Sequence, residues 1–144
     1  MRQIIVFAIV LTLAAPVSAQ KVGERTTPPE VLLAELGLGV SDAELARAVA
    51  AADAHPLGSK ENPVRVGGPD GERSYISRLR CADGQRPAIG TRNSHGTGAF
   101  GTIVDIYPLD CGAAAPGKAE LVMDMYHAEH DETRAAAGFT LSPR

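Results

Sequence analysis

The sequence predicts an α+β domain in which an antiparallel meander of three to five strands is covered by one or two N-terminal helices and closed by one disulfide. Three observations support this fold class. Two helix-start patterns lie in the first sixty residues, several segments after Gly58 alternate between apolar and polar residues, and two alternating segments end at Cys81 and Cys111.

The N-terminal segment has the three parts of a secretory signal peptide. A basic residue precedes an apolar run over residues 4–15, Pro16 interrupts that run, and Val17-Ser18-Ala19 suits cleavage after Ala19. The run is short for a bilayer span. We therefore expect residues 1–19 to be removed, the mature chain to be free of the membrane, and the protein to be periplasmic or secreted.

Two capping boxes predict helices in a leader over residues 20–57. Thr27-Pro28-Pro29-Glu30 opens a short helix that Gly37 ends, and Ser41-Asp42-Ala43-Glu44 opens an alanine-rich helix through about Ala54. Because alanines bury little area, the second helix is expected to lie flat against a sheet.

The β part is predicted over residues 58–144. Turn residues and period-two alternation favour strands with one face buried. The expected strands cover residues 63–66, 74–81, 102–109 and 119–127, with a possible edge strand at 139–141 and a turn at 67–71.

The two cysteines allow a single intramolecular bond, and an exported chain would form it. A disulfide that closes a loop of about thirty residues stabilises a fold by about 3 to 4 kcal/mol in the chain-entropy model. Cys81 and Cys111 are not a C-x-x-C pair, so we interpret the bond as structural.

The charge balance argues against a nucleic-acid partner. The chain has 14 Lys and Arg residues against 17 Asp and Glu residues, a net charge of −3, which provides no field for a polyanion. The distribution is uneven, because residues 60–100 carry seven basic and four acidic side chains. The two signs could neutralise each other within the fold, or the basic part could bind a small anion.

Four basic residues are the candidates for binding a small anionic ligand or a protein partner. Two share one face of the expected strand at 74–81, and two lie in the Gly-rich segment inside the disulfide loop: Arg78 and Arg80, and Arg92 and His95. Pairing of the two strand arginines with Asp105 or Asp124 across the sheet is the simpler alternative.

The densest set of potential metal ligands follows the last long strand. Neutral imidazole and carboxylate groups suit zinc and other divalent ions, and the candidates are Asp124, His127, Glu129 and His130. A turn at Ala128 would be needed to bring the two histidines together. The alternative interpretation is a solvated strand end.

Two other patterns carry no function. Gly96-Thr97-Gly98-Ala99-Phe100-Gly101 matches the letters of a nucleotide-binding loop, but a strand is expected after it where a dinucleotide site needs a helix. The adjacent Ser94 and His95 cannot easily adopt triad geometry, and no nucleophile elbow is present. We interpret this stretch as a flexible approach to the strand at 102–109.

Residues 58–140 resemble a family of small exported bacterial proteins of unknown function. The segments that carry the resemblance are Gly58 to Val66, Gly68 to Arg73, Arg78-Leu79-Arg80-Cys81, Asp105-Ile106-Tyr107 with Cys111, and Asp124-Met125-Tyr126-His127. The resemblance implies a domain that begins near residue 58. It implies no activity, cofactor or catalytic residue.

These observations favour a non-catalytic binding module over an enzyme. The alternative is a small metal-dependent hydrolase or metal-binding protein centred on His127 and His130. The binding module needs no cofactor, and the alternative needs a divalent metal such as zinc. A shared pocket around the candidate ligands would favour the enzyme.

Overall fold

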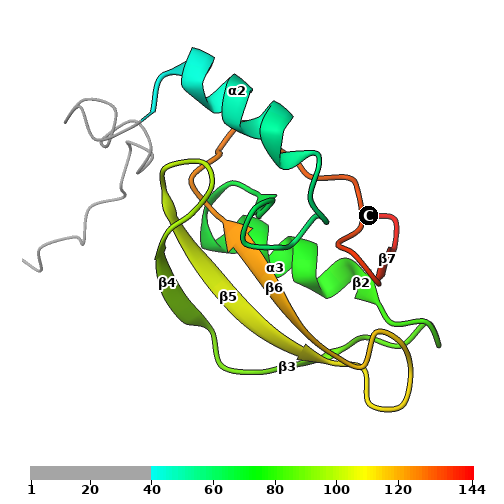
Figure 1. Cartoon of the computed structure of the whole chain (residues 1–144). Helices are drawn as coiled ribbons and strands as arrows, with labels where there is room; N and C mark the ends of the chain where they lie inside the picture. Colours follow the sequence, from blue (N-terminus) through cyan, green and yellow to red (C-terminus); the bar gives the residue numbers. More distant parts are fainter. Residues whose placement is uncertain (1–39) are drawn as a thin grey trace, which may run out of the picture.

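The computed structural model describes residues 40–144 (Figure 1). Two helices and seven strands make up this part of the chain. In chain order they are α2 (Asp42–Ala52), β1 (Val64–Arg65), α3 (Gly68–Arg78), β2 (Leu79–Arg80), β3 (Ala88–Ile89), β4 (Asn93–Thr97), β5 (Ile103–Asp110), β6 (Lys118–Asp124) and β7 (Thr140–Leu141). The α+β class is confirmed.

The long hairpin β5–β6 is the centre of the main sheet. It pairs six residues in register, from Asp105 opposite Met123 to Asp110 opposite Lys118. The strand order is β1-β6-β5-β3, and β4 pairs with β5 on the same side as β3. β1 runs parallel to β6, so the prediction of a purely antiparallel meander is wrong. Parallel neighbours require a crossover, and α3 lies in the long connection from β1 to the rest of the sheet.

The prediction of a turn at 67–71 and a strand at 74–81 is also wrong, because helix α3 occupies most of both. Pro69 lies in the first turn of this helix, where a proline loses no helical hydrogen bond. Glu72, Tyr75 and Ile76 are its buried residues, at the i, i+3, i+4 spacing of one helix face. Residues 74–81 also fit an alternating pattern, and the ionisable Glu72 on the buried face obscured the helical pattern.

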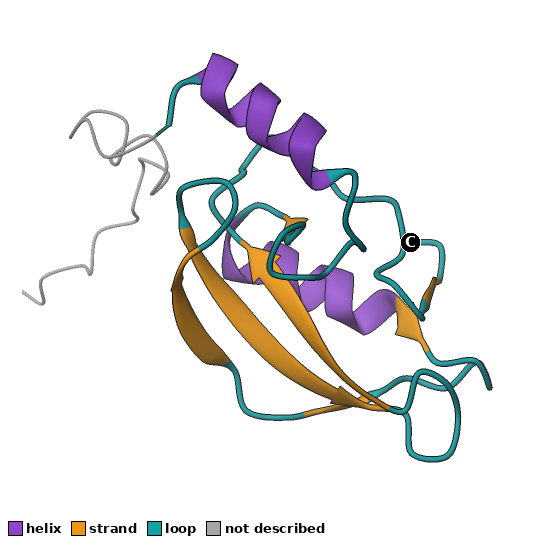
Figure 2. Ribbon diagram, in the orientation of Figure 1, coloured by secondary structure: helices purple, strands orange, loops and turns teal. Residues whose placement is uncertain are grey.

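Helix α3 covers one face of the main sheet (Figure 2). Its Tyr75 and Ile76 belong to the principal core cluster together with buried side chains of β1, β2, β5 and β6: Val64, Leu79, Leu109, Leu121 and Met123. The first turn of the helix approaches the sheet closely at Gly71, where an added Cβ would lie 3.0 Å from the Cβ of Val66. A larger residue at this position would push the helix away from β1.

Helix α2 begins as predicted but does not cover the core. Ser41 Oγ accepts from the Glu44 N–H, and Glu44 Oε2 accepts from the Ser41 N–H, so the capping box is confirmed. Ala52 is the only buried residue of α2. The N-terminal helices were predicted to cover the sheet. Helix α3, which carries larger apolar side chains, covers it instead. The predicted signal peptide and the predicted helix after Thr27 lie outside the described residues.

The predicted bond between Cys81 and Cys111 is confirmed, with Cα atoms 5.8 Å apart. Each cysteine directly follows a strand, β2 or β5. The bond therefore joins the ends of the two-stranded β2–β7 sheet and the main sheet, and it closes a loop that contains β3 and β4. In residues 40–144, neither helix has the length and apolar composition needed to cross a membrane.

We expect replacement of both Cys81 and Cys111 by Ser to lower the free energy of unfolding by about 3 to 4 kcal/mol, because the bond closes a loop of thirty residues. Denaturant unfolding of the variant and of the oxidised and reduced wild-type protein measures this. Equal midpoints for the oxidised and reduced protein would contradict the expectation.

Candidate functional site

The two arginines predicted to share a strand face are held by backbone groups. Arg78 is the last residue of α3, and its Nε donates to the Ser142 carbonyl (3.2 Å). Arg80 follows in β2, and its Nη1 donates to the carbonyls of Ser77 (2.9 Å) and Leu79 (2.7 Å). The prediction that they share one face of a strand is therefore wrong, because Arg78 ends a helix and Arg80 lies in the short strand that follows it. Arg78 instead holds the C-terminal segment beside α3.

The candidate metal ligands divide into separate pairs. His127 Nε2 lies 3.3 Å from Asp124 Oδ2, and His130 Nε2 lies 3.5 Å from Glu132 Oε2, which is not among the predicted ligands. The fourth candidate, Glu129, is exposed. The turn at Ala128 that a shared metal site would need is present, since the His130 N–H donates to the His127 carbonyl (2.9 Å). In residues 40–144, no group of three or more His, Cys, Asp or Glu side chains could hold a metal ion.

Asp124 and His127 make contacts that join two parts of the fold. The Asp124 carboxylate is fully buried and accepts from the hydroxyl of Thr102 and from the Tyr126 N–H (3.1 Å). The His127 ring packs edge-on against Phe100, with centroids 5.7 Å apart. Asp124 and His127 thus connect the end of β6 to the turn between β4 and β5.

Glu132 and its partners hold the segment after β6. Arg134 donates to both carboxylate oxygens of Glu132 (3.0 Å each) and reaches Asp53 beyond the end of α2 (3.2 Å). Burial would raise the pKa of Glu132, but the hydrogen bonds from Arg134 outweigh it and the pKa is lowered. Burial, with the positive charge of Arg65 next in effect, lowers the pKa of His130. These groups favour an ionised Glu132 beside a neutral imidazole.

A second polar cluster, not predicted from the sequence, lies between α3 and the sheet. Glu72 is fully buried, and its Oε2 accepts from the Tyr107 hydroxyl (2.8 Å). Arg92 Nη1 lies 3.3 Å from Asp105 Oδ2 and 3.6 Å from Glu72 Oε2. Arg92, which the sequence analysis selected for a ligand, is thus anchored to two carboxylates of its own chain. The i, i+3 spacing of Glu72 and Tyr75 was the sequence signal from which this cluster could have been predicted.

Burial is the main cause of the raised pKa values of Glu72 and Tyr107 in this cluster. It raises the pKa of Glu72, Asp105 acts in the same direction, and Tyr107 and Arg92 oppose the shift. Burial and the neighbouring Glu72 raise the pKa of Tyr107 to about 12. Glu72 Oε1 has no hydrogen-bond partner within the described chain, which is costly for a buried charge and favours the protonated carboxyl. The cluster holds Arg92 at the point where β4 begins.

Strands β3 and β4 form an open edge of the main sheet. Each pairs only with β5 among the described strands. All five residues of β4, including His95, are exposed, as are both residues of β3. The large hydrophobic side chains of Ile89 in β3 and Ile103 opposite Thr97 are 55% and 50% exposed. The first half of the Gly-rich stretch, Ser94 to Thr97, is therefore part of an edge strand, and residues 98–101 form the turn before β5.

Pro108 explains why this edge is divided into two strands. The Gly90 N–H donates to the Pro108 carbonyl (2.8 Å). In an antiparallel pair, the two residues of such a pair exchange both hydrogen bonds, but Pro108 has no N–H to return. The ladder between β3 and β5 ends there, and pairing resumes with a shifted register at Asn93 opposite Ile106.

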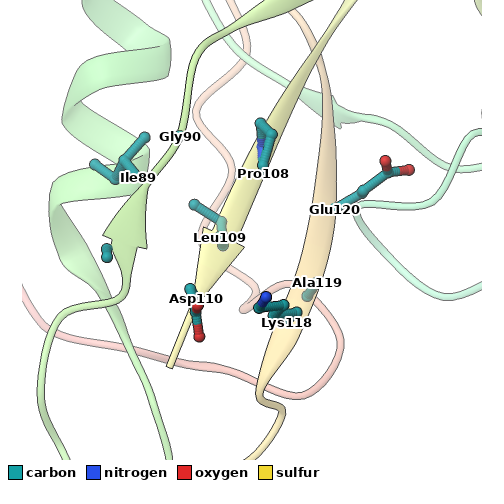
Figure 3. A pocket seen from close by; sticks show the side chains of 9 residues that line it. Ile89, Gly90, Pro108, Leu109, Asp110, Lys118, Ala119 and Glu120 are labelled. Atoms are coloured by element: carbon teal, nitrogen blue, oxygen red, sulfur yellow. The ribbon is translucent and has the colours of Figure 1, made fainter. Parts of the chain in front are cut away.

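A shallow hollow of about 580 Å³ lies beside β3 (Figure 3). It is lined by three consecutive residues from each of three neighbouring chain segments: Ala88, Ile89 and Gly90; Pro108, Leu109 and Asp110; and Lys118, Ala119 and Glu120. The hollow and the open edge are adjacent, since the first of these segments belongs to both.

No protein-family model, curated protein or solved structure matches this chain. The resemblance to small exported bacterial proteins therefore stays a prediction.

We expect Glu72→Gln to change how stability depends on pH. The raised pKa of Glu72 means that the folded state holds its proton more tightly than the unfolded chain. The stabilisation from Glu72 is therefore complete below its ordinary pKa near 4.5 and is lost as the pH rises through the folded-state value. Glutamine resembles the protonated form, so the variant should gain stability relative to wild type between pH 4.5 and pH 7.

Urea unfolding at several pH values measures this difference. Glu61→Gln is the matched control, because Glu61 is exposed, and it should follow the wild-type curve. A Glu72→Gln variant whose stability relative to wild type falls as the pH rises would contradict the expectation.

Proposed function

We propose that this protein is a non-catalytic binding domain that acts in an oxidising compartment outside the cytoplasm, and that it binds an extended segment of a partner protein along the β3–β4 edge. The observation that carries the proposal is the run of five exposed residues in β4, a strand that pairs only with β5 among the described strands. Unpaired main-chain groups on such an edge can add a strand from another chain.

The main-chain groups of Ser94 are directed toward the open side of this edge. Pro108 faces β3 through the bond from Gly90, and Ile106, two residues earlier, faces the same side of β5. Asn93 is opposite Ile106, so its groups point to β5 and those of the next residue, Ser94, point away. Ser94 can therefore donate to and accept from an added strand without any loss of pairing to β5.

The charge of the edge favours a neutral or acidic segment as the occupant. Residues 85–97 contain no carboxylate, and besides Arg92, which contacts Asp105 and Glu72, they contain Arg86 and His95. Pairing with a second copy of the same edge would bring like charges together. The register shift between Ser94 and Thr97 also limits self-pairing, because bulges twist an edge away from indiscriminate partners.

The compartment is supported by the disulfide. Structural disulfides persist where thiols are not kept reduced, and the Cys81–Cys111 bond closes the loop that contains the whole edge. An oxidising location would therefore maintain the binding surface. The predicted signal peptide agrees with this location.

The proposal predicts that Ser94→Pro weakens binding of extended peptides by about fivefold to tenfold, because one edge N–H is lost and the proline ring obstructs the added strand. Ser94→Ala is the matched control and should bind like wild type. Peptides are selected from a displayed library of random decapeptides on the disulfide-intact protein. Titration then measures their affinities, and amide chemical shifts should change along residues 88–97.

Several outcomes would contradict this proposal. The library could yield no binder, or the shift changes could lie away from the edge. Equal peptide affinity of the Ser94→Pro and Ser94→Ala variants would also contradict the proposal. A concentration-dependent dimer that Ser94→Pro disrupts would assign the edge to a second copy of the chain.

The metal-dependent alternative makes a different prediction. A metal bound only by the folded protein would raise the melting temperature when it is added. Since the histidines lie in separate pairs with Asp124 and Glu132, we expect the same melting temperature in zinc and in chelator. A zinc-dependent increase that His127→Ala and His130→Ala each abolish would favour the metalloprotein instead.

A further inference from the structure

The carboxyl groups of Glu72 and Asp105 share one guanidinium group at the start of the proposed binding edge. Arg92 Nη1 lies 3.3 Å from Asp105 Oδ2 and 3.6 Å from Glu72 Oε2. The Glu72 side chain is fully buried and that of Asp105 is 9% exposed, whereas the Arg92 side chain is 48% exposed. Arg92 therefore lies between a buried pair of acidic groups and the solvent.

This cluster is connected to β4 at two positions. Arg92 directly precedes the first residue of β4, and Asp105 lies opposite Ser94 in the β4–β5 register. Ser94 is the residue whose main-chain groups are proposed to pair with an added strand. Because β4 lies at the outer margin of the sheet (Figure 1) and pairs only with β5 among the described strands, a change in the cluster acts directly on the part of the edge that a partner would contact.

The surroundings of Glu72 favour a proton on its carboxyl group. Tyr107 donates to Oε2 (2.8 Å), but Oε1 has no hydrogen-bond partner within the described chain. A buried carboxylate oxygen without a donor is costly, and two neighbouring carboxylates disfavour the ionisation of both. The single charge of Arg92 is divided between Glu72 and Asp105. The closed arrangement is therefore most stable with Glu72 protonated.

The other ionisable groups around Glu72 do not supply a second positive charge. Burial and the neighbouring Glu72 raise the pKa of Tyr107 to about 12, so its hydroxyl remains a donor at neutral pH. Tyr126, which follows β6, is a second neutral phenol, and burial raises its pKa as well. On α3 itself, the exposed Arg73 pairs with Asp70. The charge of an ionised Glu72 would thus be balanced mainly by water.

We propose that the proton on Glu72 regulates the edge, an inference that rests on the proposed function. With the proton bound, the cluster holds the start of β4 ready for an added strand, and loss of the proton to solvent loosens it. Hydration of an ionised Glu72 requires its surroundings to open. Helix α3 is fixed in the core by Tyr75 and Ile76, whereas Arg92 is half exposed and precedes five exposed residues. Opening on the side of Arg92 disturbs the least packing.

The direction of the pH dependence follows from the linkage between proton binding and conformation. Burial raises the pKa of Glu72 in the closed cluster, Tyr107 opposes this shift, and Asp105 adds to it. In the open arrangement, water surrounds the carboxyl group and its pKa is closer to the ordinary value of 4.5. A pH that rises through the raised pKa therefore shifts the population toward the open arrangement. Affinity for an added strand is highest below that pKa and falls above it.

Peptide affinity measured as a function of pH tests the inference. The probe is a selected decapeptide with blocked termini and neutral replacements for its titratable side chains, so that only the protein changes charge. Between about pH 5 and about pH 8, the affinity of wild type should fall by about fivefold. Glu72→Gln resembles the protonated form and should keep the high affinity throughout. Glu61→Gln, at an exposed position, is the matched control and should follow wild type.

Asp105→Asn provides a readout that a purely structural role would not change. Because Asp105 contributes to the raised pKa of Glu72, this variant should move the midpoint of the affinity curve to lower pH. Carbon NMR shifts of the Glu72 carboxyl group give the ionisation midpoint directly in the peptide-free protein. The amide shifts of Asn93 and Ser94 should follow the same midpoint. The exposed His95 is present in every variant, so its contribution cancels in the comparison.

The outcomes distinguish the inference from the proposed function. A pH dependence that wild type and Glu72→Gln share overturns regulation by Glu72 and leaves the edge function standing. Amide shifts of Asn93 and Ser94 that are independent of Glu72 ionisation, or a wild-type affinity that rises with pH, have the same consequence. If no peptide binds residues 88–97 at any pH, both proposals fail.

Discussion

The packing of α3 against the β5–β6 hairpin is the interaction on which the rest of this structure depends. The helix brings Tyr75 and Ile76 into the core cluster that also contains Leu109 and Met123. Apolar burial of this kind is the main favourable contribution to folding. The same helix face buries Glu72, so an ionisable carboxyl group must be accommodated at the centre of the packing. The polar contacts between the helix and the sheet follow from that constraint.

The accommodation of Glu72 connects the core to the edge of the sheet. Tyr107 and Arg92 reach its carboxylate, and Arg92 also contacts Asp105. Arg92, whose side chain stays about half exposed, is therefore tied to the fold at the residue that precedes β4. These contacts give the chain a defined position at the start of β4, whose own five residues are exposed. Among the described strands, β4 pairs with β5 alone.

The disulfide and Pro108 shape the remainder of the edge. The Cys81–Cys111 bond closes the loop at its base, and the missing N–H of Pro108 ends the first pairing with β5 after Gly90. Together they produce two short exposed strands and an adjacent hollow in place of one long flat edge. This division reduces indiscriminate edge-to-edge association, and the proposed partner strand would pair with the main-chain groups that have no partner among residues 40–144.

Local signals determined what the sequence could predict alone. The capping box at Ser41, the alternation in β5 and β6, and the pairing of Cys81 with Cys111 depend on near neighbours or on having two cysteines, and all are confirmed. Only the tertiary structure decided that residues 68–78 are helical, because their pattern fits both periods and the surface they cover determines the choice. It also decided the partners of Arg92 and His127, since contacts between groups far apart in the chain or across a turn have no local sequence signature.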